Sequence, residues 1–128
     1  MNPNPVTWFE IYVDNMARAK TFYETVLQKS LEGLEDPNDT ESKIIMQAFP
    51  ANMEDYGAAG ALVKMEGVSA GGNSTLVYFA CEDCAVEESR VADAGGTVER
   101  TKMSIGEFGF ISLVIDTEGN MIGLHSQS

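Results

Sequence analysis

The sequence predicts an α+β fold in which two βαβββ modules curl their sheets around a cleft. An alternating strand and an amphipathic helix open the chain, and the same order returns after a glycine-containing stretch at 67–73. Overlaying the two halves with an offset of 68 residues aligns Val13 with Cys81 and Asn15 with Asp83. Each half continues with about three more strands, so the chain has the pattern of an internal repeat.

The length of 128 residues suits one compact domain. We expect a single domain over residues 1–128, with module one at about 6–66 and module two at about 74–126. Gly71 and Gly72 are adjacent and mark the most linker-like stretch between the modules.

The first strand has one apolar face, formed by Phe9, Ile11 and Val13 at period two. The residues after it predict a helix, because apolar positions recur at spacings of three and four and the Asp-Asn pair at 14–15 can cap it. The apolar positions of this helix are Met16, Ala19, Phe22, Tyr23, Val26 and Leu27. We expect this helix to pack on the apolar face of the strand.

The remaining elements follow from short apolar runs between turn signals. In module one, an acidic loop with its turn at 37–39 separates two short strands, and 51–59 is an irregular loop over the cleft. In module two, Asp83 can cap a helix that we expect to run through Ala94, and DTEGN at 116–120 predicts a hairpin. The other expected strands are at 43–49, 60–65, 74–81, 97–103, 110–116 and 121–125.

Composition excludes several classes of function. The formal net charge of -12 and the lack of a basic run disfavour nucleic-acid binding, because phosphate contacts need clustered Lys and Arg. No apolar stretch reaches membrane-spanning length, and the N-terminus lacks the pattern of a signal peptide. With two cysteines, a disulfide framework is not expected. We therefore expect a cytoplasmic protein that binds neither nucleic acid nor membrane.

Two stretches, WFEIYVDNMARAKTFYETVL and FGFISLVIDTEGNMIGL, resemble the vicinal oxygen chelate superfamily. That superfamily holds glyoxalase I, bleomycin-resistance proteins and extradiol dioxygenases. The resemblance covers essentially the whole chain and is greatest to the group related to lactoylglutathione lyase. It implies a glyoxalase/bleomycin-resistance-like fold, a small-molecule ligand or substrate and a small homodimer.

The resemblance also implies where a metal site would be. Carried onto this chain, the first, third and fourth ligand positions fall on Trp8, Leu76 and Gly123, and the second falls within 60–65, where no carboxylate stands. Trp, Leu and Gly cannot coordinate a divalent ion. The standard metal site is therefore absent, and we expect no cofactor, with an atypical divalent metal as the alternative.

Two polar residues are candidates for catalysis. Glu10 shares a strand face with Trp8, and His125 shares one with Gly123, so both are expected on the cleft side. A carboxylate and an imidazole could act as base and proton shuttle, or ligate an atypical ion. The alternative is that Glu10 is hydrogen-bonded inside the barrel and His125 lies at a frayed edge.

The expected ligand-binding residues come from the same alternation. Tyr78 aligns with Glu10 in the repeat, and an apolar strand face is expected from residues 110–114. The expected lining residues are Trp8, Tyr12, Met46, Tyr78, Phe110 and Ser112. An ordinary barrel core would show the same residue types.

Three functions remain open. The first is a protein that binds a small molecule in an apolar cleft without the standard metal. The second is a lyase or isomerase that uses Glu10 as base with His125 assisting, with or without an atypical metal. The third is a thiol redox protein that uses Cys81 and Cys84, whose C-x-x-C spacing lies at the start of the second helix.

Overall fold

The structure is a computed structural model that describes residues 4–34, 44–52 and 54–128. The acidic turn expected at 37–39 lies outside these residues. In the described part of the chain, neither helix is long and apolar enough to cross a membrane.

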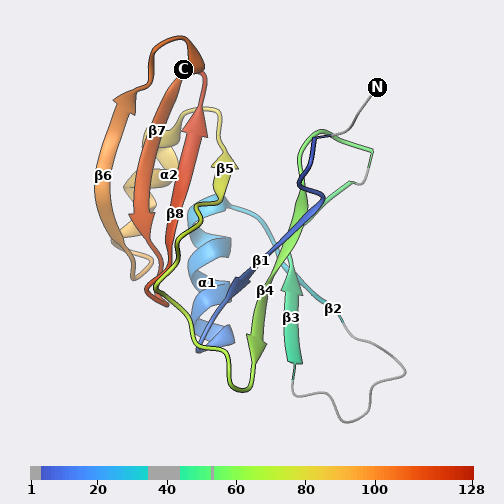
Figure 1. Cartoon of the computed structure of the whole chain (residues 1–128). Helices are drawn as coiled ribbons and strands as arrows, with labels where there is room; N and C mark the ends of the chain where they lie inside the picture. Colours follow the sequence, from blue (N-terminus) through green and yellow to red (C-terminus); the bar gives the residue numbers. More distant parts are fainter. Residues whose placement is uncertain (1–3, 35–43, 53) are drawn as a thin grey trace.

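Two four-stranded sheets form the framework (Figure 1). Sheet A has the order β1-β4-β3-β2 and sheet B the order β5-β8-β7-β6. In each sheet the first two strands of this order are parallel and the other pairs are antiparallel. The strands are β1 (Trp8–Tyr12), β2 (Glu32–Leu34), β3 (Ile44–Ala48), β4 (Ala59–Met65), β5 (Tyr78–Ala80), β6 (Thr97–Ser104), β7 (Phe110–Ile115) and β8 (Met121–Ser126).

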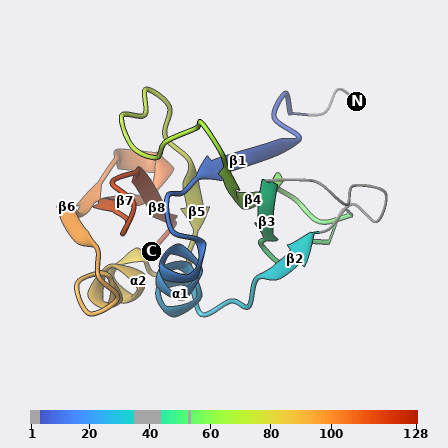
Figure 2. The same ribbon diagram turned by 90° about the horizontal axis from the view of Figure 1, so that it is seen from below.

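Two helices, α1 (Met16–Leu27) and α2 (Cys84–Val91), follow β1 and β5. The side chain of Asn15 caps α1 by accepting from the amide of Arg18, and Asp83 caps α2 by accepting from the amide of Ala85. The helices pack against each other and lie on the same side of the two sheets (Figure 2). A short 3₁₀ helix, η1, covers Gly106–Phe108.

The internal repeat predicted from the sequence is confirmed by this topology. Both modules have one strand order, and α1 and α2 begin 68 residues apart, at Met16 and Cys84. The α+β class with two βαβββ modules is therefore correct. The two sheets, however, do not close around a cleft, and each keeps one face away from the helices. We call the face of each sheet that points away from the helices its open face. Trp8 on the open face of sheet A is 41% exposed, and Tyr78 on the open face of sheet B is 46% exposed.

The core lies between the sheets and the helices and is shared by both modules. As predicted, Ile11 and Val13 are buried under α1, beside Phe22 and Val26. The core continues into module two through Cys84, Val91, Val114, Ile122 and Leu124. One continuous apolar core therefore holds the modules together.

A polar network at the β7–β8 turn also joins the modules. The carboxylate of Glu118 accepts hydrogen bonds from the amides of Asp14 and Asn15, at 2.9 and 2.8 Å. The guanidinium of Arg18 donates to the same carboxylate from Nε at 2.7 Å and Nη2 at 3.0 Å. This carboxylate, with no exposed side-chain area, therefore lies at the N-terminus of α1, where the helix dipole favours an anion.

Two other side chains of the turn reach module one. Asp116 accepts a 2.6 Å hydrogen bond from the hydroxyl of Tyr23, and Asn120 donates from Nδ2 to the carbonyl of Tyr12 at 2.8 Å. Asn120 also accepts from the amide of Gly71 at 2.7 Å. The DTEGN hairpin is thus an intermodule junction as well as a turn.

Two elements are shorter than predicted. The second helix ends at Val91, short of Ala94, and the amide of Gly96 bonds to the carbonyl of Val91 at 2.9 Å. Residues 74–77 are irregular because Asn73 bonds to the backbone of Met121 through Oδ1 and Nδ2, which leaves only Tyr78–Ala80 as strand.

Candidate functional site

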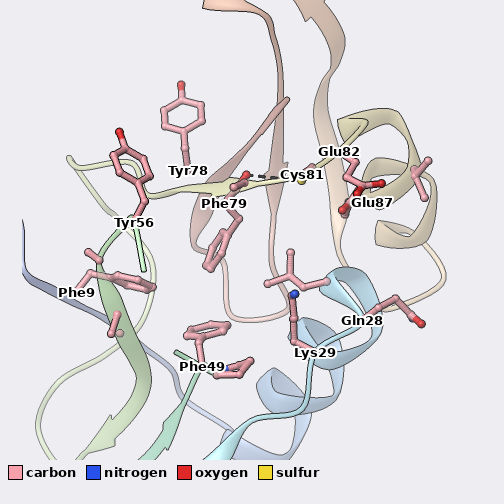
Figure 3. A pocket seen from close by; sticks show the side chains of 18 of the residues that line it. Phe9, Gln28, Lys29, Phe49, Tyr56, Tyr78, Phe79, Cys81, Glu82 and Glu87 are labelled. Carbon is pink, nitrogen blue, oxygen red and sulfur yellow. Dashed lines mark hydrogen bonds between the residues drawn. The ribbon is translucent and has the colours of Figure 1, made fainter. Parts of the chain in front are cut away.

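A pocket of about 700 Å³ lies between the modules (Figure 3). Its walls come from the start of β1, residues 49–50 and 56–58, the start of β4, the end of α1, strand β5 and one side of α2. This volume is in the range of pockets that hold small organic ligands. We call it the module-junction pocket.

One wall is aromatic and is formed by the rings of Phe9, Phe49 and Phe79, which we call the aromatic triad. The ring centroids are 5.8 Å apart for Phe9–Phe49, 5.9 Å for Phe9–Phe79 and 5.3 Å for Phe49–Phe79. Gly60 makes room for this wall, because a Cβ there would lie 2.5 Å from the Phe9 ring. The triad offers a ligand flat apolar surface in tilted and edge-on orientations.

The rest of the lining carries charge. Glu82 and Glu87 lie on the side of the pocket away from Phe9, and the ammonium of Lys29 points inward from the end of α1 (Figure 3). Arg90 also lines the pocket and donates from Nη1 to the carbonyl of Val26 at 3.0 Å. The pocket therefore combines an apolar end with a charged end.

The open face of sheet A carries a separate cluster at Glu10. Its carboxylate accepts from Nε1 of Trp8 at 3.2 Å and from the hydroxyl of Tyr12 at 2.8 Å. The hydrogen bond to Glu10, burial and the charge of Glu10 all raise the pKa of Tyr12. As predicted, these three side chains share the strand face opposite Phe9, and the pocket lies on the Phe9 side.

The structure does not bring Glu10 and His125 together. Glu10 lies on β1 of sheet A, whereas His125 lies on β8 of sheet B, opposite Ala80 and Ile111. Nε2 of His125 is 2.7 Å from the carbonyl oxygen of Phe108. Each of the two candidates therefore has its own local partners.

The other expected lining residues fall in different places. Tyr78 lines the module-junction pocket, and its ring covers Gly123. Met46 lies opposite Val63, which is opposite Tyr12, so Met46 is on the open face of sheet A.

The placement of Phe110 and Ser112 was predicted wrongly. Ser112 is fully buried opposite Leu124 on the helix-covered face, where its hydroxyl donates to the carbonyl of Arg100 at 3.1 Å. Phe110 packs against the same core and lies under the ammonium of Lys102. Phe110 and Ser112 share one face of β7, as the alternation predicted, but this face points toward the helices, and the open face carries the alternate residues Ile111, Leu113 and Ile115.

Sequence reasoning missed most of the pocket lining. Phe49, Phe79, Lys29 and Glu87 looked like ordinary core or surface residues at their positions. Gly60 was a signal, since a glycine inside a strand often marks the close approach of another group.

Comparisons with known proteins identify the family. Residues 6–124 match the family model described as the Glyoxalase/Bleomycin resistance protein/Dioxygenase superfamily. The chain belongs to this superfamily. No curated protein sequence gave a significant match.

Solved structures of the superfamily have the same fold. Glyoxalase I from Zea mays has a TM-score of 0.75 at 20% identity, over 99% of this chain and 47% of that one. Glyoxalase I from Leishmania major has a TM-score of 0.71 at 16% identity, over 98% of this chain and 88% of that one. A glyoxalase/bleomycin resistance protein from Albidiferax ferrireducens T118 has a TM-score of 0.69 at 17% identity, over 98% and 100%. The chain spans about half the length of the maize enzyme.

The residues at the superfamily's metal positions do not fit a divalent ion. Gly123 lies opposite Tyr78, and the repeat counterpart of Tyr78, Glu10, lies opposite Ala61. This makes Ala61 the counterpart of Gly123 in module one. Trp8, Ala61, Leu76 and Gly123 supply no side-chain donor that a metal prefers. Among the residues that the structure describes, no group of three or more His, Cys, Asp or Glu is arranged to hold an ion.

Thiolate formation is opposed at Cys81, and Cys84 is shielded from solvent. Burial, followed by the charge and hydrogen bonding of Glu87, raises the pKa of Cys81 to about 12, and Cys84 is fully buried. We expect iodoacetamide at pH 8 to alkylate the folded protein at least about a hundredfold more slowly than the urea-unfolded chain, because the thiolate is the reactive form. Mass spectrometry of timed samples measures this ratio. Rapid labelling of folded Cys81 would contradict it and favour the thiol redox function.

Proposed function

We propose that this superfamily member binds a small organic molecule in the module-junction pocket and that binding needs no metal ion at the standard position. The observation that carries the proposal is the pocket itself, about 700 Å³ in volume with the aromatic triad as one wall. Apolar pockets with a few convergent polar groups are the usual form of small-molecule sites.

The donor chemistry at the metal positions supports the metal-free part of the proposal. The indole of Trp8, the isobutyl group of Leu76 and the hydrogen of Gly123 offer a divalent ion nothing to bind. The lyase or isomerase alternative needs Glu10 and His125 to act on one substrate. Their hydrogen bonds go to different partners in different sheets, which does not support this alternative.

Filling the pocket tests the proposal. Val86 lines the pocket from α2 and is 46% exposed, so Val86→Trp adds an indole there without removing a core side chain. We expect the variant to lower the affinity for 2-naphthol, a neutral aromatic probe, by about tenfold or more, because the indole and the probe compete for the same space. Titration followed by ¹H–¹⁵N correlation spectra measures the affinity and shows which amides shift.

The matched control is Ser89→Trp, an exposed position on the same helix outside the pocket lining. It adds the same side chain and should leave the affinity unchanged. Binding in wild type should also survive exhaustive dialysis against a chelator. Probe-induced shifts centred on Trp8 and Tyr12, with Val86→Trp indistinguishable from wild type, would overturn the proposal and place the ligand on the open face.

A further inference from the structure

The module-junction pocket is lined by charges of both signs that form no ion pair with one another. Glu82 and Glu87 face the pocket together with Lys29. Within the part of the chain that the structure describes, the side chains of Lys29 and Glu82 make no hydrogen bond or ion pair. A cation and an anion that share a cavity without pairing leave both charges available to a ligand.

The other charged groups of the lining differ in what they contact. Asp83 is paired with Lys102 at 2.8 Å, whereas Arg90 donates Nη1 to the neutral carbonyl of Val26 and keeps its positive charge, which adds to that of Lys29. Glu87 lies beside the thiol of Cys81, where its charge helps to raise the pKa of that thiol. A neutral thiol leaves the negative charge of Glu87 uncompensated.

The apolar and charged groups lie at different ends of the pocket. The aromatic triad forms one side, with Phe9 farthest from the carboxylates, and Lys29 points between the two regions (Figure 3). A flat ring would pack on Phe79 and Phe49, while polar groups at one end of the same molecule would reach Lys29 and Glu87.

We propose that the ligand is a small aromatic zwitterion of the amino-acid type, with its ring on the aromatic triad, its ammonium at Glu82 and Glu87 and its carboxylate at Lys29. The inference rests on the proposed function, since it assigns a ligand class to the same pocket. A ligand with one sign of charge would pair at one group and meet like charge at the other, so the pocket selects against it.

Four probes with one ring system separate the contributions. L-tryptophan carries both charges, N-acetyl-L-tryptophan lacks the cation, L-tryptophan amide lacks the anion, and indole has neither. We expect L-tryptophan to bind about fivefold more tightly than each singly blocked analogue, because a solvent-accessible ion pair contributes modestly. The difference in affinity between L-tryptophan and indole should be larger still, because indole lacks both charges.

Variants assign each charge to its side chain. L-tryptophan should bind to Lys29→Met no more tightly than L-tryptophan amide binds to wild type. Its affinity for the double variant Glu82→Gln/Glu87→Gln should match the affinity of N-acetyl-L-tryptophan for wild type. The matched controls are Lys20→Met and Glu99→Gln, which remove like charges outside the pocket lining and should change nothing. Affinities from titration calorimetry and amide shifts provide two readouts.

The outcomes separate the two proposals. Binding of indole and 2-naphthol in the pocket, without any preference for L-tryptophan, would overturn the zwitterion and leave the proposed function standing. A preference for L-tryptophan that survives all of the pocket charge variants would also overturn it. If no aromatic probe shifts the amides of the pocket, both proposals fail.

Discussion

Replacing Glu118 by Gln is expected to lower the free energy of unfolding by about 3 kcal/mol at neutral pH. The carboxylate is shielded from solvent and accepts from two backbone amides, from Arg18 and from the hydroxyl of Thr117. A Gln side chain would turn an N–H₂ group toward some of these donors and leave them unpaired. The bonds join residues about 100 positions apart, so their loss weakens the contact between the modules.

The stability should also depend on pH in a defined window. Burial alone would raise the pKa of Glu118, but the hydrogen bonds from Arg18, from the amide of Asn15, from Thr117 and from the amide of Asp14 outweigh it and lower the pKa from 4.5 to about 2. A depressed folded pKa means that the stabilisation is fully present above about pH 4.5 and is lost as pH falls toward 2. The full change over this window corresponds to about 3 kcal/mol.

Urea unfolding of wild type and Glu118→Gln at several pH values between 2 and 7 measures both effects. The variant should be less stable at pH 7 and should lose less stability on acidification, so that the two curves converge near pH 2. Glu99→Gln, at an exposed carboxylate on β6, is the control and should follow wild type. If the unfolding free energies of wild type and Glu118→Gln changed in parallel between pH 2 and 7, the pKa of Glu118 would not be lowered by folding. The contact between the modules at the β7–β8 turn would then not depend on the charge of Glu118.

The fold could be predicted from the sequence because its signals are local and repeated. In β1 the apolar residues recur at every second position, and in α1 they recur at spacings of three and four, so the buried face of each element can be predicted. The overlay with an offset of 68 residues then predicts the elements of the second module from those of the first. The second helix ends earlier than predicted because a local turn at Gly95 and Gly96 returns an amide to the carbonyl of Val91. Strand β5 is short because the side chain of Asn73 takes the backbone groups of Met121, and a contact across 48 residues has no local signature.

The site was less predictable for the same reason. Alternation correctly placed Trp8, Glu10 and Tyr12 on one face of β1, but it could not tell which face would border a cavity. That depends on how sheet A and sheet B meet over the helices, which brings Phe9 and Phe79 to a centroid distance of 5.9 Å. In β7 alternation likewise put Phe110 and Ser112 on one face, but it could not show that this face would be covered by the helices.

Asp116→Ala is expected to cost about 3 to 4 kcal/mol of unfolding free energy, the largest effect of any single change at the junction. The Asp116 carboxylate accepts from the hydroxyl of Tyr23 at 2.6 Å and from the amides of Glu118 and Asn120 at 2.8 and 2.9 Å. Tyr23 is fully buried, so its hydroxyl would have no water to replace the lost acceptor. The two amides set the geometry of the turn, so their release also misplaces the Glu118 carboxylate.

A double-mutant cycle with Tyr23→Phe separates these contributions, and urea midpoints measure each corner. If the buried hydroxyl accounts for part of the loss, Tyr23→Phe should cost less in the Asp116→Ala background than in wild type, by about 1 to 2 kcal/mol. Asp93→Ala, at an exposed aspartate beyond α2, is the control and should stay near wild type. Additive losses would show that Asp116 acts through the turn alone. A coupled loss, together with weaker binding of 2-naphthol by Asp116→Ala under conditions where it remains folded, would link the junction to the pocket, since both depend on how α1 and module two are held together.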